Sequence, residues 1–308
     1  MTCPFLNEAQ VKYCQTSSVR KLIPIAAVGR AADKCSSADH LTCPVFRAHP
    51  VQGAEETAGD AATCGACPFL GESLMQYCAA APVVKMVPYS ESLLARCGSD
   101  RFRYCELYLS MAHPRIVAEE VDGIPVPEWL RYSTNHMWLD VGEDGYCHAG
   151  IDGFLSRALG RAERISYVWQ QGQHRATAVV TVNGVDHELV FPNPFLMTSC
   201  NLYLRADPSR LTAEPYTSGW LFEGKPAPET SANLLQGAAA RHWMEQEQRR
   251  INEFLQQQPG PNGPLAADGG LFAPGLAQYL DQEQMRAMFH TFFSPYADPN
   301  PAAQGANS

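Results

Sequence analysis

Residues 176–191 read ATAVVTVNGVDHELVF, and this stretch decides the fold of the middle of the chain. Two β-rich runs lie on either side of Asn183-Gly184, the dipeptide that most strongly favours a two-residue hairpin turn. We therefore expect two antiparallel strands joined at that turn. Because alternate residues of a strand point to opposite faces, Asp186 and Glu188 are expected to share a face near the tip of the hairpin.

The segments around the hairpin carry further short elements. Strand or turn character is found in WLDV at 138–141, GEDG at 142–145 and ISYV at 165–168. Asp152 is a suitable N-cap for a short helix over 153–159, which Gly160 would end. Many short strands with few helices are typical of an all-β sandwich or barrel. The sequence thus predicts an α+β chain whose central domain, 125–226, is all-β.

Several motifs of this domain, in this order, resemble the H protein of the glycine cleavage system. They are YSTNHMW at 132–138, GIDGF at 150–154 with Leu159-Gly160, DPSRL at 207–211, EPY at 214–216 and GWLF at 219–222. The corresponding family features are an opening tyrosine with a His-x-Trp strand, a Gly-Ile-Thr-x-Tyr segment with Leu-Gly, and a closing stretch. The resemblance covers a third of the chain. It implies the flattened hybrid of barrel and sandwich that lipoyl and biotinyl domains share.

The lipoyl lysine that the resemblance implies is missing. The Glu-Ser-Val-Lys hairpin of the family aligns with NGVD at 183–186, which puts Asp186 at the lysine position, and its Pro-Val-Ser-Gly turn aligns with PFLM at 194–197. Lipoate is joined to a lysine amine, which an aspartate lacks. No lysine occurs between Lys85 and Lys225, so a shifted alignment supplies none. We expect an H-protein-like scaffold without lipoate.

Other polar residues of the domain are interpreted as structural. Asp186, His187 and Glu188 form a polar cluster at the former arm position that could bind a metal, but a solvated hairpin is the favoured interpretation. Cys147-His148 and Cys200 fall in predicted strands, and we interpret them as core or edge residues rather than ligands.

The N-terminal part of the chain contains a duplication. CPFL at 3–6 returns at 67–70, and KLIP at 21–24 returns as KMVP at 85–88. Four cysteines recur with gaps of 10, 20 and 7 residues in one copy and 10, 18 and 7 in the other: Cys3, Cys14, Cys35 and Cys43, then Cys67, Cys78, Cys97 and Cys105. The copies occupy 1–50 and 64–113, and the Ala-, Gly- and acid-rich stretch 51–63 is interpreted as a linker.

Three interpretations of these eight cysteines stay open. Each copy could hold an iron–sulfur cluster or Zn²⁺ through four thiolates, form disulfides or redox-active dithiols, or bury its thiols as small hydrophobes. A copy of about 45 residues with few large apolar side chains usually needs a staple, which favours a metal. Iron–sulfur is placed ahead of zinc, because paired C-x-x-C knuckles are lacking except at 64–67.

Helices between the cysteines would limit a shared metal site. If 7–13 and 71–77 are helical, each helix separates its flanking cysteines by about 16 Å. The same limit applies to Cys97 and Cys105, between which a capped helix over 101–109 is expected. One metal could then hold both cysteines of a pair only if the helix is short or the chain doubles back.

Two amphipathic helices are expected near the C-terminus. The expected segments are a helix over 230–257 capped by Thr230 or Ser231, a Pro/Gly linker over 258–270, a second helix within 271–293, and a disordered tail over 294–308. The partial apolar stripe of the first helix favours packing within the chain. A homodimer or partner contact through these helices is the alternative.

The composition of the chain argues against some classes of binding partner. The chain of 308 residues is 45% hydrophobic and 18% charged, which is globular, and its net charge of -9 comes without a basic patch for nucleic acid. No apolar run approaches the about 18 residues of a spanning helix, so no membrane partner is expected. Residues 1–6 lack the features of a secretory signal, so a cytoplasmic location is expected.

No catalytic motif favours an enzyme: a nucleotide-binding glycine loop, a G-x-S-x-G elbow and an H-E-x-x-H helix are all lacking. The expected function is that of a non-catalytic adaptor or redox-responsive protein. It would dock a protein partner through the H-protein-like domain and bind metal through its cysteines. An electron-transfer iron–sulfur protein and a divergent H-like protein are the alternatives.

Overall fold

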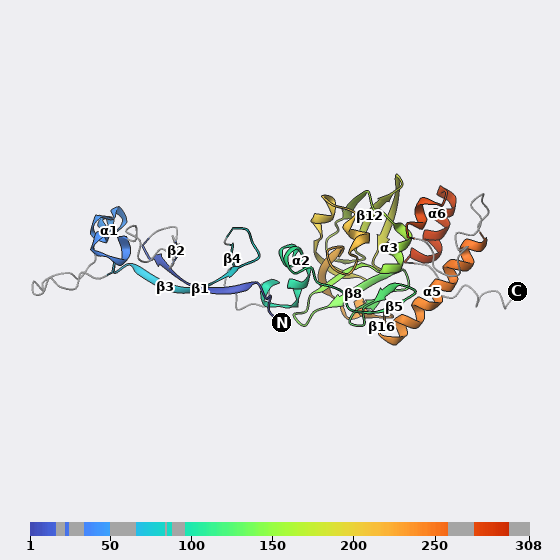
Figure 1. Ribbon diagram of the computed structural model, residues 1–308, viewed down its shortest axis with the longest axis horizontal. Coiled ribbons are helices and arrows are strands. Elements are labelled where there is room, and N and C mark those ends of the chain that lie inside the picture. The colour runs from blue at the N-terminus through green and yellow to red at the C-terminus, as the bar shows by residue number, and fades with distance from the viewer. Residues whose placement is uncertain are drawn as a thin grey trace, which may run out of the picture. The chain divides into compact units, whose positions relative to one another are not determined.

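The computed structural model describes residues 1–16, 22–24, 34–49, 66–83, 85–87, 96–257 and 274–295 (Figure 1). The chain forms two compact units, one of residues 2–95 and one of Met1 with residues 96–308. This boundary falls inside the predicted second copy, so Cys97 and Cys105 belong to the larger unit. The expected linker 51–63, the linker 258–270 and tail residues 296–308 lie outside the described residues.

The larger unit is a mixed helix and sheet structure built on open antiparallel sheets. A seven-stranded sheet contains, in spatial order, β11 (Gln173–His174), β14 (Phe195–Cys200), β15 (Phe222–Pro226), β9 (Cys147–Ile151), β8 (Met137–Val141), β7 (Arg131–Tyr132) and β16 (Leu235–Gln236). A three-stranded sheet contains β10 (Arg164–Val168), β12 (Thr177–Val182) and β13 (Val185–Val190). A two-stranded sheet contains β5 (Glu119–Val121) and β6 (Ile124–Val126).

The expected central hairpin is confirmed. Strands β12 and β13 pair from Val182↔Val185 to Thr177↔Val190. At the turn, Asn183 and Gly184 have φ of 51° and 72°. Positive φ at both turn positions gives the twist that matches two antiparallel strands, and it explains the Asn-Gly pair.

The motif residues form the core of the larger unit. The ring of Trp138 is fully buried and donates from Nε1 to the carbonyl oxygen of Pro215 at 3.1 Å. Gly150 lies across from it, and a Cβ there would come within 2.6 Å of the Trp138 ring. The hydroxyl of Tyr216 accepts from the backbone N–H of Gly153 at 2.7 Å. Burying a large apolar side chain contributes about 1.5–3 kcal/mol to the free energy of folding, so the buried Trp138 stabilises this arrangement of the sheet.

Helices flank the sheets of the larger unit. They are α2 (Glu106–Ala112), α3 (Gly153–Leu159), α4 (Arg210–Ala213), α5 (Ala238–Gln257) and α6 (Gln282–Met288), followed by a π-helical turn, η9 (Phe289–Phe293). As expected, the Asp152 side chain caps α3 by accepting from the Leu155 N–H, and Gly160 ends the helix. No helix in the described part of the chain is both long enough and apolar enough to cross a membrane.

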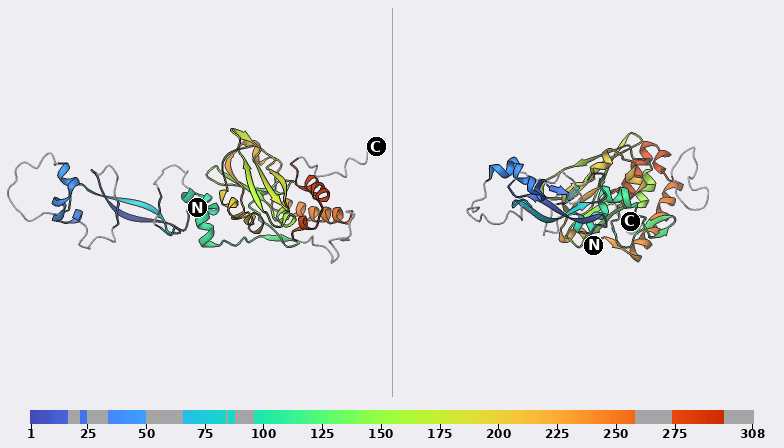
Figure 2. Two further views of the ribbon diagram at one scale, coloured as in Figure 1. Left: turned by 90° about the horizontal axis from the view of Figure 1, so that it is seen from above. Right: turned by 60° about the vertical axis from the view of Figure 1, so that its left-hand side comes forward.

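The C-terminal helices begin later than predicted. Thr230 lies in a 3₁₀ turn, η7 (Pro228–Ser231), where its hydroxyl donates to the carbonyl of Pro194 at 2.7 Å, so α5 starts only at Ala238. Asp281 caps α6, and the residues before it form a separate 3₁₀ turn, η8 (Leu276–Gln278). The apolar stripe of α5 is buried within the chain at Trp243, Met244, Ile251 and Leu255. In Figure 2, α5 and α6 lie at the same side of the unit.

The smaller unit is built on a four-stranded antiparallel sheet in the order β2-β1-β3-β4. Its elements are β1 (Leu6–Cys14), β2 (Leu22–Pro24), β3 (Leu70–Cys78), β4 (Lys85–Val87), the 3₁₀ turns η2 (Lys34–Ser36) and η3 (Ala38–Thr42), and α1 (Pro44–Ala48). The conditional expectation of helices over 7–13 and 71–77 is wrong. These segments are strands, because β1 and β3 pair along their whole length.

The expected helix over 101–109 is also wrong. The chain forms a 3₁₀ turn, η5 (Asp100–Tyr104), and then α2 from Glu106. Cys105 between them is extended, with φ -81° and ψ 126°. A further 3₁₀ turn, η4 (Arg96–Gly98), holds Cys97. A 3₁₀ turn followed by a separate helix replaces the single expected helix, and Arg101 and Tyr104 of the turn are held by Glu223 and Asp140.

Candidate functional site

Asp186, at the position implied for the lipoyl lysine, lies on β13 two residues beyond the hairpin turn. Its Oδ1 accepts from the Thr181 hydroxyl at 2.6 Å and from Arg164 Nη2 at 3.3 Å. The Thr181 hydrogen bond, with help from the Arg164 guanidinium, holds the pKa of this exposed carboxyl below its usual range. The position therefore presents a fixed anion and offers no amine for acylation.

His187 faces the opposite way and is buried by the C-terminal segment. Its Nε2 lies 3.0 Å from Sδ of Met285, and its ring stacks on Phe289 with centroids 3.8 Å apart. Burial lowers the pKa of His187, so the ring is neutral near pH 7. The cluster 186–188 is thus divided: Asp186 and Glu188 are exposed on one face, and the histidine packs against α6 and η9.

The C-terminal segment is fixed to the hairpin and to α3. The Asn183 side-chain amide donates to the carbonyl of Ala277 at 2.9 Å, and the Gly275 N–H donates to the carbonyl of Arg157 at 2.7 Å. Gly160 and Gly275 both have positive φ and touch: a Cβ on Gly160 would lie 2.6 Å from the Gly275 Cα.

Gly160→Ala is expected to lower the free energy of unfolding by about 1–3 kcal/mol through this clash, beyond the strain of its φ of 70°. Urea unfolding measures the loss. Gly145→Ala is the matched control, because Gly145 has φ of 76° and open space at the Cβ position. Equal losses in the two variants would show that the contact with Gly275 is dispensable.

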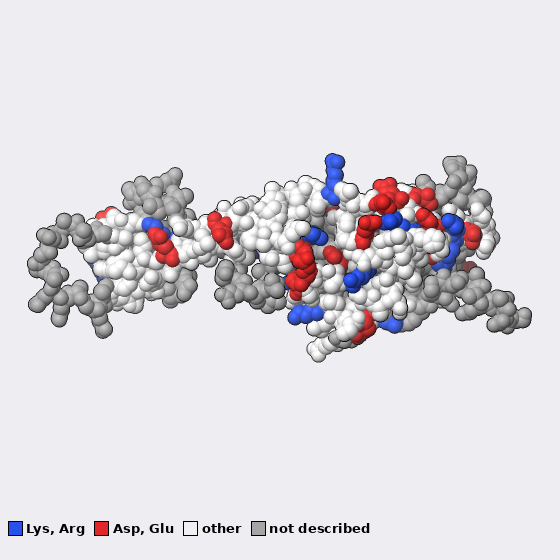
Figure 3. Space-filling view, turned by 90° about the horizontal axis from the view of Figure 1, so that it is seen from below, with Lys and Arg blue, Asp and Glu red and all other residues white. Residues whose placement is uncertain are grey.

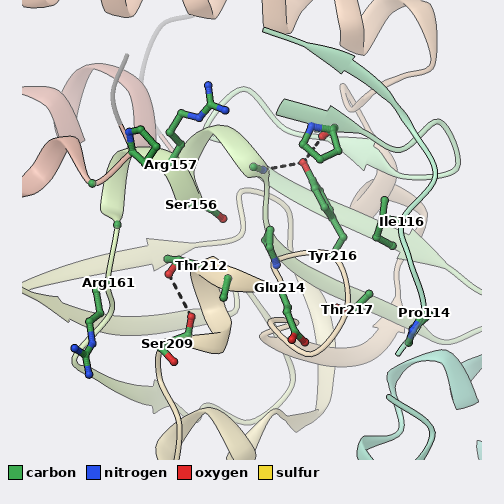
Figure 4. A pocket seen from close by; sticks show the side chains of 17 residues that line it. Pro114, Ile116, Ser156, Arg157, Arg161, Ser209, Thr212, Glu214, Tyr216 and Thr217 are labelled. Atoms are coloured by element: carbon green, nitrogen blue, oxygen red, sulfur yellow. Dashed lines mark hydrogen bonds between the residues drawn. The ribbon is translucent and has the colours of Figure 1, made fainter. Parts of the chain in front are cut away.

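Two grooves flank these contacts. One, of about 640 Å³, is lined by β13 and the π-helical turn and includes Arg175, Glu188 and His290. The other, of about 610 Å³, lies beside α3 (Figure 4). In the second groove the Thr212 hydroxyl donates to the Ser209 carbonyl, and Tyr216 is hydrogen-bonded to the α3 backbone. These two polar groups are thus used within the protein, and the groove indicates no particular ligand.

A buried ion network surrounds Glu223 on β15. Arg96 Nη2 lies 2.5 Å from its Oε2, and Arg101 Nη2 lies 2.6 Å from its Oε1. His148 Nε2 is 3.0 Å from Oε2, so its N–H donates to the carboxylate. Burial lowers the pKa of His148, so the ring is neutral near pH 7. Burial alone would raise the pKa of Glu223, but the His148 hydrogen bond and the two arginines outweigh it and lower the pKa to about 2.

A second buried network joins α5 to the sheet. His136 Nδ1 is 2.8 Å from Asp152 Oδ2, and His136 Nε2 is 3.5 Å from Glu247 Oε2. Arg250 pairs with the same Glu247 at 2.5 Å. The His136 ring stacks on Phe154 with centroids 4.1 Å apart. Burial by itself would lower the pKa of His136, but the two carboxylates outweigh it and raise the pKa to about 9.

Sequence reasoning missed both networks. Cys147, His148 and Cys200 do lie in strands, as expected, but the partners of His148 were not identified. The available signal for the Glu223 network was a charged residue directly after the apolar GWLF motif and two arginines, Arg96 and Arg101, near Cys97. On the face drawn in Figure 3, the described Lys and Arg residues are interspersed with Asp and Glu, which agrees with the lack of a basic patch.

The predicted metal ligands are distributed over both units. Cys3, Cys14, Cys35, Cys43, Cys67 and Cys78 belong to the smaller unit, and Cys97 and Cys105 to the larger. Within the described residues, no three His, Cys, Asp or Glu side chains converge as in a formed metal site. Strand β1 of the first copy pairs with strand β3 of the second, so cysteines of different copies can lie closer together than cysteines of one copy.

The chain matches no protein-family model, but its middle matches curated relatives. It is 30% identical over 118 residues to the glycine cleavage system H protein of Halorhodospira halophila, covering 37% of this chain and 91% of that protein. The H protein of Salinibacter ruber is 30% identical over 117 residues, covering 37% and 94%. The solved structure of an H protein from Mycobacterium marinum aligns with 39% of this chain over 99% of its own length. The sequence identity is 21% and the TM-score is 0.35.

The hairpin, the antiparallel sheets and the motif residues define a lipoyl-domain-like module. By these matches, the chain belongs to the glycine cleavage system H protein family. The expected resemblance is confirmed at this level, and the match accounts for 37% of the chain.

Proposed function

We propose that the H-protein-like domain is a non-catalytic docking module that carries no lipoate. The observation that supports this is the carboxylate of Asp186 at the arm position, held by Thr181 and Arg164. A carboxylate cannot form the amide that joins lipoate to a lysine. What remains is the shape of the module, which a protein that binds lipoyl domains can recognise.

The outer face of the β10-β12-β13 sheet is the proposed docking surface. Asp186 and Glu188 are exposed there, and Arg164 lies beside them. The inner face of the hairpin is not available, because His187 is covered by Met285 and Phe289. The partner is therefore expected to contact the exposed acidic side of the hairpin.

The first test is acceptance of lipoate. The full-length chain, incubated with lipoate, ATP and a lipoate–protein ligase, is expected to show no lipoyl adduct by intact mass. The H protein of Halorhodospira halophila, treated in parallel, is the positive control. An adduct on this chain would contradict the proposal.

The second test is docking without modification. If the module keeps a lipoyl-domain surface, the chain should slow the ligase-catalysed modification of that H protein in a concentration-dependent manner. The double variant Asp186→Arg/Glu188→Arg should lose this inhibition, because two acidic contacts become repulsive. Glu143→Arg, a change at another exposed acidic residue, on the β8–β9 turn, is the control. Lack of inhibition by the wild-type chain, or full inhibition by the double variant, would refute this docking surface.

A further inference from the structure

The pairing of β1 with β3 brings the end of the first cysteine copy to the start of the second. In the register of the sheet, Cys14 lies opposite Leu70. The backbone N–H of Gln15 donates to the carbonyl of Phe69 at 2.9 Å. The turn that contains Phe69 begins at Cys67, whose carbonyl accepts from the Leu70 N–H at 2.9 Å. Cys14 of one copy thus lies beside the Cys67 turn of the other.

Cys35 lies at the same end of the sheet. The N–H of Cys67 donates to the carbonyl of Cys35 at 2.7 Å, so the two backbones are in contact. Lys12 reaches the neighbouring Ser36 hydroxyl at 3.3 Å from its Nζ. Residues two apart on a strand share a face, so the Cys14 side chain lies on the face that Lys12 presents to η2.

Cys43 is brought to this end by aromatic packing. It directly precedes α1, and its N–H donates to the His40 carbonyl at 2.9 Å. From α1, the Phe46 ring packs on Phe69 of the Cys67 turn, with centroids 5.8 Å apart. The segments that carry four cysteines, three from the first copy and one from the second, therefore meet at one end of the four-stranded sheet.

The described part of the smaller unit has a small apolar core. Among its described residues, the buried apolar side chains are Cys3, Val11, Cys67 and Ala80. Apolar burial must offset the conformational entropy of ordering the chain, and small domains with a limited core commonly need a covalent or metal cross-link. One of these four side chains is Cys67, which belongs to the cysteine-bearing segments that meet at this end of the sheet.

We propose that Cys14, Cys35, Cys43 and Cys67 form one tetrathiolate metal centre assembled from both copies. On metal uptake each thiol releases its proton to solvent, turns about its Cα–Cβ bond and donates a sulfur electron pair to the metal. Four thiolates suit Zn²⁺ or an iron–sulfur cluster. This grouping replaces the expected one of four ligands within each copy. This proposal does not rest on the proposed docking function of the H-protein-like domain.

Metal stoichiometry tests the grouping in the full-length chain purified anaerobically, with zinc, iron and acid-labile sulfide measured per chain. Cys14→Ser and Cys67→Ser should each lose the same centre, about one Zn²⁺ or one cluster. The double variant should lose no more than either single variant. If the ligands were grouped within each copy, the double variant would lose two centres. Cys200→Ser, a change in the larger unit, is the control and should keep the full content.

Thiol protection tests the same centre without a substitution that could unfold the unit. The anaerobic wild-type chain is alkylated with iodoacetamide before and after its metal is stripped, and each cysteine is followed by mass spectrometry. Cys14, Cys35, Cys43 and Cys67 should become reactive together. The proposal would be overturned if the chain bound no metal. It would also be overturned if the four thiols did not become reactive together, or if the double variant lost two centres.

Discussion

Replacing Glu223 with alanine is expected to lower the free energy of unfolding of the larger unit by about 3–5 kcal/mol. The carboxylate is buried and accepts from Arg96, Arg101 and His148. Removing it takes away the carboxylate that lies 2.6 Å from the buried Arg101 guanidinium, and Asp144 lies farther off, at 4.0 Å. A buried charge that has lost its partner strongly destabilises the folded state. In the wild-type chain, the attraction between the carboxylate and its cationic partners roughly offsets the free energy of removing them from water.

Glu223→Gln separates charge from shape. The amide keeps the volume but removes the charge, so we expect an intermediate loss in urea unfolding. The matched control is Asp186→Ala, which breaks an ion pair whose side chains are 70% and 53% exposed. That loss should be much smaller than the loss for Glu223→Ala, because exposed pairs are screened by solvent. Similar losses for the buried and the exposed carboxylate would contradict the network.

The network also predicts a response to acid. The pKa of Glu223 falls from its usual 4.5 to about 2 in the folded chain, so the folded state holds the proton less tightly than the unfolded state. Its contribution is complete above pH 4.5 and is lost as the pH falls through 2. The difference in stability between the wild-type chain and Glu223→Gln should therefore shrink over this window.

Local patterns predicted the parts of the fold that local chemistry determines. The Asn183-Gly184 turn needs positive φ at both positions, and Asp152 needs only the first turn of α3 to act as its cap. Both were predicted because their signals lie within a few residues. The resemblance motifs include residues that the structure places in the core, Trp138 among them, although their burial was not predicted.

The rest depends on residues far apart in the sequence. Strand β1 pairs with a strand more than 50 residues away, and this pairing overrode the helical interpretation of 7–13. The contact of Arg101 with Glu223 spans 122 residues, and no local pattern encodes it. The same holds for the grouping of Cys14 with Cys67. Sequence identified the cysteines but not which of them meet.

Alkaline pH is expected to weaken the larger unit through His136. The pKa of this ring rises from 6.5 to about 9 on folding, so the folded chain binds its proton more tightly than the unfolded chain. The stabilisation is therefore fully present below pH 6.5 and is lost as the pH rises through 9. A shift of this size corresponds to about 3 kcal/mol.

The His136→Gln variant isolates this effect, because other groups that titrate at alkaline pH are common to both proteins. Urea unfolding from pH 6 to pH 10 should show that the stability advantage of the wild-type chain shrinks by about 3 kcal/mol over the range. Glu247→Gln should reduce the change by removing one of the two carboxylates that hold the proton.

A constant difference between the wild-type chain and His136→Gln across this range would refute a protonated His136. It would mean that α5 is held by apolar packing of Trp243 and Ile251 alone. A difference that shrinks with rising pH would instead show that the attachment of α5 depends on a buried imidazolium between Asp152 and Glu247. That result would explain how charged side chains of α5 can be buried beside its apolar stripe, since the charges of His136 and Arg250 balance those of the two carboxylates.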